Sequence, residues 1–136
     1  MRDVINIFQG FFVAIGAFLG GLLGGIDGFL YTLIFLVITD YLTGVMVAIL
    51  EKKLASSYGF RGIFKKVLIF ILVSIAHIID LRILESGSAI RTAVIFFYIS
   101  NEGISILENV GKIGLPIPKK LMDVLEQLNK EEKSNE

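Results

Sequence analysis

Two long uncharged runs limit what this chain can fold into. Residues 4–26 form a run of 23 without a charged side chain, and residues 28–50 form a second run of 23 that only Asp40 interrupts. An α-helix needs about 20 apolar residues to cross the hydrocarbon core of a bilayer. A chain of 136 residues, 54% of them hydrophobic, has too little interior to bury such runs in a soluble core. The sequence therefore predicts an integral membrane protein.

Two further apolar stretches extend this expectation. Residues 67–79 and 92–101 lack charges, and each reaches spanning length by including charged residues near its ends. Long charged side chains near a helix end can extend to the headgroups, which lowers the cost of insertion. We expect an all-α fold of helical hairpins, with three to four transmembrane helices plus a C-terminal amphipathic helix.

The expected boundaries follow from these runs. The spanning segments are predicted at about residues 4–26, 29–50, 66–84 and 89–109. They form a transmembrane domain of residues 1–116, in which the first, glycine-rich segment either spans the membrane or lies in its interface. Residues 117–136 are predicted to form a cytoplasmic amphipathic helix and a charged tail.

Small residues recur at helical spacing in the first two segments. Gly16, Gly20 and Gly24 are four residues apart, and Gly44 and Ala48 share a face in the second segment. Such a strip lets another helix backbone approach closely. We expect these residues to pack helices together, either within one subunit or between subunits.

Polar side chains lie on three of the apolar segments. On a helix, the polar residues of 101–109 fall within one arc of about 120°. These are Asn101, Glu102, Ser105, Glu108 and Asn109. The second and third segments add Asp40, Thr43, Ser74, His77 and Asp80. We interpret this set as a polar face that hydrogen-bonds within one bundle, meets another subunit or lines water.

The energetic cost of these groups supports that interpretation. An ionised aspartate near the middle of a membrane costs about 2.5–3.5 kcal/mol, so Asp40 should face protein or water instead of lipid. His77 and Asp80 are three residues apart and are expected to make a structural polar contact.

A basic segment between the second and third runs predicts the topology. Residues 51–66 carry one acid, Glu51, against Lys52, Lys53, Arg61, Lys65 and Lys66. Short loops rich in lysine and arginine stay on the cytoplasmic side, so this segment and the C-terminus are predicted to be cytoplasmic. Its glycines and serines predict a turn instead of a continuous helix.

Composition and motifs argue against several function classes. The formal net charge is zero, which disfavours nucleic acid as a partner, and the chain has no cysteine for a disulfide or thiolate site. It has one histidine and neither a GxxxxGK[ST] nor an HExxH motif. We expect no enzymatic activity, no metal and no cofactor.

Three stretches of the sequence, taken in combination, resemble a known family across about residues 39–121. The elements are Asp40, Thr43-Gly44, Ser56-Ser57, Gly59, Gly62, Lys66, the Asp80 that ends the third segment, Asn101-Glu102, Ser105-Ile106, Glu108-Asn109, Gly114 and Pro118. The combination resembles the phage-lysis and toxin-secretion holins of Gram-positive bacteria and their phages.

The resemblance implies a small protein of the bacterial cytoplasmic membrane that accumulates, forms homo-oligomers and opens lesions at a set time. These lesions release an endolysin to the cell wall, and relatives encoded beside large toxins are implicated in toxin export. The resemblance implies neither enzymatic activity nor a cofactor. The residues alone are also compatible with two alternatives. One is a constitutive small ion channel or transporter subunit in which Asp40, Asp80 and Glu102 are acids of the ion pathway. The other is a non-conducting anchor whose C-terminal helix binds a cytosolic partner.

Overall fold

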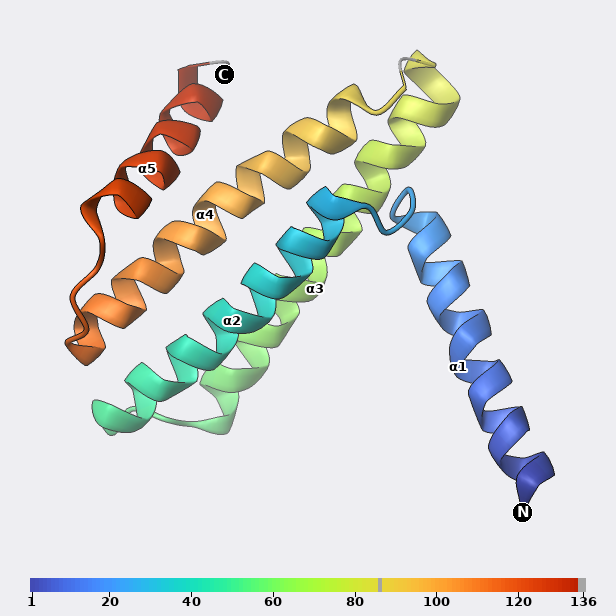
Figure 1. Ribbon diagram of the computed structural model, residues 1–136, viewed down its shortest axis with the longest axis horizontal. Helices are drawn as coiled ribbons and strands as arrows, with labels where there is room; N and C mark the ends of the chain where they lie inside the picture. The colour runs from blue at the N-terminus through green and yellow to red at the C-terminus, as the bar shows by residue number, and fades with distance from the viewer. Residues whose placement is uncertain (86, 135–136) are drawn as a thin grey trace.

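The computed structural model describes residues 1–85 and 87–134, and this part of the chain is a set of helices joined by short connections (Figure 1). The elements are α1 (Arg2–Leu22), α2 (Gly28–Leu50), α3 (Ser56–Ile78), the π-helical turn η1 (Ile79–Leu84), α4 (Ala89–Ile113) and α5 (Lys119–Ser134). Four helices of the described chain are long and apolar enough to cross a membrane, the third of them spanning Gly59–Leu84. The predicted all-α membrane fold is confirmed. The last two residues of the predicted charged tail lie outside the described residues.

Local signals in the sequence determine where several helices begin and end. The Asp27 side chain accepts a hydrogen bond from the Leu30 amide at 2.9 Å, which caps the start of α2. Helix α4 ends at Ile113 and is capped by Gly114, whose φ of 104° is one that glycine adopts without a steric penalty. The prolines that follow prevent the helix from continuing, and α5 begins directly after Pro118.

Helix α3 begins earlier than the sequence predicts. Residues 51–55 connect α2 to α3, and the helix then runs from Ser56 through Gly59 and Gly62, so the predicted turn over residues 51–66 is wrong beyond residue 55. A Cβ at Gly59 would lie 3.4 Å from the Tyr41 hydroxyl oxygen, and one at Gly62 would lie 3.3 Å from the Tyr41 ring. The two glycines give Tyr41 room to pack on α3, and this packing outweighs their weak helix propensity.

The core lies between α2, α3 and α4. Helix α4 is central, because it packs against α2, α3 and α5. The buried apolar residues are Leu30, Leu33, Val37, Ile69, Val73, Ile95 and Ile99. Large apolar side chains such as Phe35 and Phe64 point outward and are more than half exposed. So much exposed apolar surface suits contact with lipid and is unusual for a soluble protein.

Helix α1 diverges from the bundle (Figure 1). Gly20 is the one buried residue of α1, all of which the structure describes. The helix ends at Leu22, and Gly24 lies in the following turn with a φ of 88°. The expectation that Gly24 continues a helical strip with Gly16 and Gly20 is therefore wrong, because this left-handed backbone conformation ends the helix.

Helix α5 lies antiparallel beside α4 (Figure 1) and approaches it closely at Gly103. A Cβ at Gly103 would lie 2.9 Å from Cδ2 of Leu125, so the absence of a side chain there admits Leu125. The amphipathic character predicted for residues 117–136 thus gives a helix whose apolar side covers α4.

Gly103→Val should displace α5 from α4 and cost about 1–3 kcal/mol, the range for overpacking a close contact. Tryptic cleavage within α5, followed in liposomes, should become several times faster. The matched control is Gly10→Val on α1, where a Cβ meets nothing within 4 Å. Equal cleavage rates for the two variants would contradict the close α4–α5 contact.

Candidate functional site

Three ionisable side chains from three helices meet inside the bundle. The Lys66 ammonium of α3 donates hydrogen bonds to the Asp40 carboxylate of α2 and the Glu102 carboxylate of α4. The side chains of Lys66, Asp40 and Glu102 are 19%, 10% and 9% exposed, respectively. We call these three residues the Lys66 cluster. It joins α2, α3 and α4 at a point that the helices shield.

Two further polar side chains extend the cluster. The Asn109 amide nitrogen lies 3.2 Å from Oδ1 of Asp40 and 3.0 Å from Oγ1 of Thr43, and it donates to both oxygens. The Thr43 hydroxyl donates in turn to the backbone carbonyl of Thr39 at 2.9 Å. Asp40 is thereby held from two sides, by the cation of α3 and by the amide of α4.

The charges of the Lys66 cluster do not balance when all three groups are ionised. Two carboxylates share one ammonium, which leaves one negative charge in a protein interior. Burying an ion costs several kcal/mol, and only good pairing and hydrogen bonding offset that cost. The cluster therefore stabilises the packing of α2, α3 and α4 only while Lys66 stays between its two partners.

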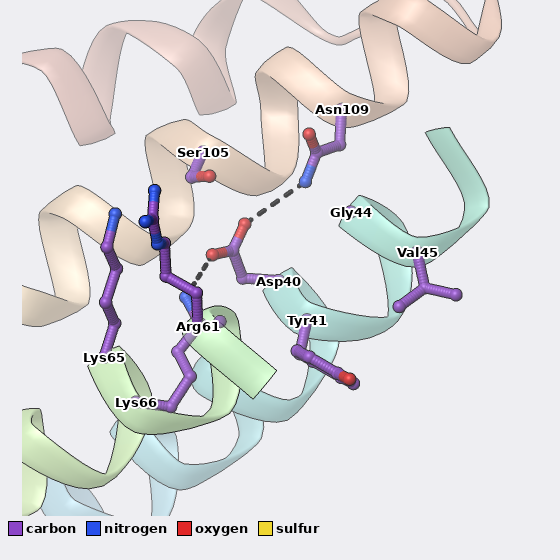
Figure 2. A pocket seen from close by; sticks show the side chains of 10 residues that line it. Asp40, Tyr41, Gly44, Val45, Arg61, Lys65, Lys66, Ser105 and Asn109 are labelled. Atoms are coloured by element: carbon purple, nitrogen blue, oxygen red, sulfur yellow. Dashed lines mark hydrogen bonds and ion pairs between the residues drawn. The ribbon is translucent and has the colours of Figure 1, made fainter. Parts of the chain in front are cut away.

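A cavity of about 210 Å³ opens beside the Lys66 cluster. Its walls come from α2, α3 and α4, and they combine cationic, polar and small residues. The lining residues are Asp40, Tyr41, Gly44, Val45, Arg61, Gly62, Lys65, Lys66, Ser105 and Asn109. Figure 2 shows Asp40 between Asn109 and Lys66, with the Arg61 and Lys65 side chains extending toward α4 near Ser105.

A second polar cluster lies at the opposite end of α4 and centres on Arg91, which is 3% exposed. Its guanidinium donates to the backbone carbonyls of Leu23 at 2.6 Å and Gly25 at 2.8 Å, and to the Asp27 carboxylate at 2.8 Å. A Cβ at Gly24 would lie 2.5 Å from Nε of Arg91, so a glycine is required beside this guanidinium. Arg91 therefore fixes the turn between α1 and α2 to the start of α4.

The Arg91 contact also changes the acidity of Asp27, which lies between the spanning helices. Hydrogen bonding from the Arg91 guanidinium holds the pKa of the Asp27 carboxyl below its usual value of 3.8; burial opposes this effect, and the Leu30 amide adds a smaller lowering. Since Asp27 is ionised at neutral pH, the pair keeps its charge assistance there.

Asp80 completes this end of the bundle. Its carboxylate accepts hydrogen bonds from the backbone amides of Ile90 at 3.0 Å and Arg91 at 2.8 Å. These amides belong to the first turn of α4, which favours a negative charge because of its unpaired donors and the helix dipole. Asp80 itself lies on the π-helical turn η1, so it joins the end of α3 to the start of α4.

The structure divides the predicted polar face between these places. Asp40, Thr43, Glu102 and Asn109 belong to the network around Lys66, Ser105 lines the cavity, and Asp80 lies at the far end. The remaining members are half-buried or exposed: Ser74, His77, Asn101 and Glu108. Each helix turns only one side toward its neighbours, so the face is not continuous within one subunit. Its role as a pore lining stays a prediction.

The predicted packing residues also separate into two groups. Gly44 faces α4, since a Cβ there would lie 3.8 Å from the Asn109 amide nitrogen, and Ala48 is buried. A Cβ added at Gly16 would meet nothing within 4 Å, and one added at Gly20 would lie 3.5 Å from Cγ1 of Ile26. The second-segment residues thus pack within the subunit, whereas the strip on α1 is largely unoccupied.

Sequence reasoning missed the roles of Lys66, Arg91 and Asp27. Lys66 was expected in the cytoplasmic loop with Lys52, Lys53, Arg61 and Lys65, but α3 includes Arg61, Lys65 and Lys66. The available signal was position: Lys66 directly precedes the uncharged residues 67–79, and Arg91 directly precedes the uncharged residues 92–101. A cation at such a place has to find an anion when the helix packs.

The fold and its buried ion clusters define a small multi-pass helical membrane protein. A family model for the bacteriophage holin family matches residues 17–130. The chain belongs to the bacteriophage holin family, and the predicted resemblance is confirmed.

The chain is also similar to individual proteins, one of which is called a probable holin. The chain is 42% identical over 130 residues to an uncharacterized 14.9 kDa protein from the nagH 3′ region of Clostridium perfringens, which covers 95% of this chain and 98% of the relative. It is 40% identical over 88 residues to a "Probable holin" of Bacillus phage phi105, which covers 65% of this chain and 64% of that protein. No solved structure matches the chain.

Lys66→Met should destabilise the fold by about 3–5 kcal/mol, the range for removing one partner of a buried ion pair, because two carboxylates then face each other. Unfolding in mixed micelles measures this loss. Combining it with Asp40→Asn and Glu102→Gln should restore most of the stability, since no uncompensated charge is left.

The control for this variant is Lys53→Met, whose side chain is 77% exposed in its pair with Glu51. An exposed pair contributes less than about 1 kcal/mol, so this change should be nearly neutral. If Lys66→Met were as stable as Lys53→Met, the Lys66 cluster would not hold the helices together.

Asp27→Asn should reveal the charge assistance of the Arg91 contact, because asparagine can still cap α2 but carries no charge. A carboxylate whose pKa is lowered in the folded state stabilises the fold fully at pH values above its unfolded-state pKa of 3.8. This contribution is lost as the pH falls through the lower pKa of the folded state. The stability difference between wild type and variant should be full at neutral pH and disappear at strongly acidic pH. A difference that does not change with pH would show that the Asp27 charge contributes nothing.

Proposed function

We propose that this protein acts as a timed membrane-permeabilising holin. It accumulates in the bacterial cytoplasmic membrane, assembles into homo-oligomers and then opens lesions that release an endolysin or allow export of a toxin. The family assignment and the "Probable holin" relative support this role. The observation that carries the proposal furthest is the Lys66 cluster, a set of charged groups buried where three largely apolar helices meet.

The charge imbalance of the Lys66 cluster gives the protein two competing states. In the closed subunit, Asp40 and Glu102 share Lys66 and the polar groups are satisfied internally. In an open assembly, the same polar sides of α2 and α4 would face water, where an extra negative charge costs little. Accumulation favours contacts between subunits, and a small free-energy difference between the two arrangements decides when opening occurs.

Of the two outer helices, α1 is the one free to take part in assembly. Helix α1 presents Gly16 beside open space and makes few contacts with the bundle, so its glycine strip suits a close approach of a second subunit. Helix α5 covers α4 from the other side. Assembly through α1 leaves the bundle of α2, α3 and α4 closed until the polar sides separate.

The charge distribution supports an orientation. Lys52 and Lys53 lie in the connection between α2 and α3, and Lys112, Lys119 and Lys120 follow at the same end of the bundle. By the positive-inside rule, these lysines support a cytoplasmic position for this end and for the C-terminal helix.

Glu102→Gln tests the two-state proposal with an isosteric change. The variant leaves Lys66 and Asp40 as a balanced pair, which relieves the buried negative charge and favours the closed state. A bias of about 1.4 kcal/mol lowers the open population about tenfold, so lysis should be strongly delayed or blocked while membrane insertion is unchanged. The matched control is Glu126→Gln on α5, which should lyse at the normal time.

The measurement uses a bacterium that carries an endolysin and a cytosolic reporter enzyme. Membrane potential and reporter release are followed after induction. The proposal expects a silent interval, then abrupt depolarisation with protein release, and a long delay for Glu102→Gln. Normal timing in Glu102→Gln would contradict the two-state role of the Lys66 cluster. Gradual ion leakage with retained reporter would instead identify the chain as a constitutive channel.

A further inference from the structure

The cavity beside the Lys66 cluster contains cations that the cluster does not use. Three cationic side chains, Arg61, Lys65 and Lys66, line it against one carboxylate, Asp40. Lys66 is engaged by Asp40 and Glu102. Arg61 and Lys65 are four residues apart on α3 and both are exposed, and neither has an acidic partner among the side chains that the structure describes. Counted with Glu102, the cluster and the cavity hold three cations and two carboxyl groups, and the two cations outside the cluster, Arg61 and Lys65, are available to an anion at the exposed side of the cavity.

The depth of these cations matches the level of a lipid headgroup. Arg61 and Lys65 lie in the second and third turns of α3, about 7–14 Å along the helix axis from its start. The spanning stretch begins at Gly59, so both cations belong to the part of the bundle nearest the 51–55 connection. Cations at this depth are stabilised when they reach phosphate groups at the membrane surface.

An apolar groove lies next to the cavity. It has a volume of about 450 Å³, is formed by α2 and α3, and includes Leu54, Phe60 and Ile63. The groove shares Tyr41 and Val45 with the basic cavity, so the two spaces adjoin along one wall. Gly59 and Gly62 position this wall, because they let the Tyr41 ring lie against α3.

We propose that the basic cavity binds the phosphate of an anionic phospholipid, with one acyl chain in the adjoining apolar groove. The Arg61 guanidinium and the Lys65 ammonium contact the phosphate, and the Tyr41 ring separates the headgroup from the chain. Free phosphate offers the same charge but leaves the apolar groove unfilled, so the lipid is the better match. This site depends on the membrane fold alone and not on lesion formation or on the orientation proposed above.

The test compares lipid retention by the full-length chain after extraction from vesicles of phosphatidylcholine with a minor fraction of phosphatidylglycerol. Native mass spectrometry counts the phosphatidylglycerol molecules that stay bound. Arg61→Gln/Lys65→Gln should retain about tenfold less phosphatidylglycerol, because each cation near the surface contributes to anionic lipid binding. The matched control, Lys119→Gln/Lys120→Gln, removes two cations outside the cavity and should retain as much as the wild type.

Further variants keep the proposal open to contradiction. Arg61→Lys preserves the charge and should retain most of the lipid, whereas Gly62→Leu should displace Tyr41 and reduce retention while both cations remain. Circular dichroism checks that each variant keeps its helices. Equal retention by Arg61→Gln/Lys65→Gln and wild type, or equal losses in that variant and the lysine control, would overturn the site. Release of the lipid by millimolar inorganic phosphate would identify a soluble anion as the ligand and overturn the lipid assignment.

Discussion

The cost of holding charge inside an apolar bundle governs how the helices of this protein associate. Lys66 lies between Asp40 and Glu102, so three helices contribute one charge each to the same point. An ion left alone there costs several kcal/mol, which makes the arrangement strongly dependent on keeping all partners together. Apolar packing between α2, α3 and α4 brings the helices into contact, but it provides little orientation in lipid, where tails are as apolar as leucine. The ion cluster supplies that orientation.

The two ends of the bundle are held by different means. Around Lys66 the contacts are between side chains and two carboxyl groups share one ammonium, whereas around Arg91 and Asp80 the partners include backbone carbonyls and amides. Backbone partners cannot move away without disturbing a helix end or a turn. The Arg91 end is therefore suited to act as a fixed attachment for the helices, and the Lys66 end is the place where side chains can exchange partners. This difference is the physical basis of the proposal that the bundle opens at the Lys66 end.

Much of the fold was predictable, and the reason is the length of the apolar runs. The long apolar helices, the C-terminal amphipathic helix and the family could be inferred from uncharged stretches and from polar residues such as Asp40 and Asn109 at fixed spacing, whereas the number of spanning helices was predicted only as three to four. The turn expected over residues 51–66 was wrong, because Gly59 and Gly62 serve the packing of Tyr41 and do not break the helix. Gly24 was predicted to continue the first helix because it lies four residues after Gly20. It lies instead in a turn with a positive φ, where the absence of a side chain admits Arg91.

Taken by itself, the sequence determined that this chain lies in a membrane, because no other environment accommodates two runs of 23 residues that together contain one charged side chain in so short a protein. It also indicated that polar residues inside the apolar runs, such as Asp40, need a partner, since their burial in lipid is costly. Only the tertiary structure decided which partners they have. Lys66 and Glu102 are 36 positions apart in the chain, and Arg91 and Asp27 are 64 apart. Contacts over such separations depend on how helices cross and rotate against each other, and that information is present only once the whole bundle has packed.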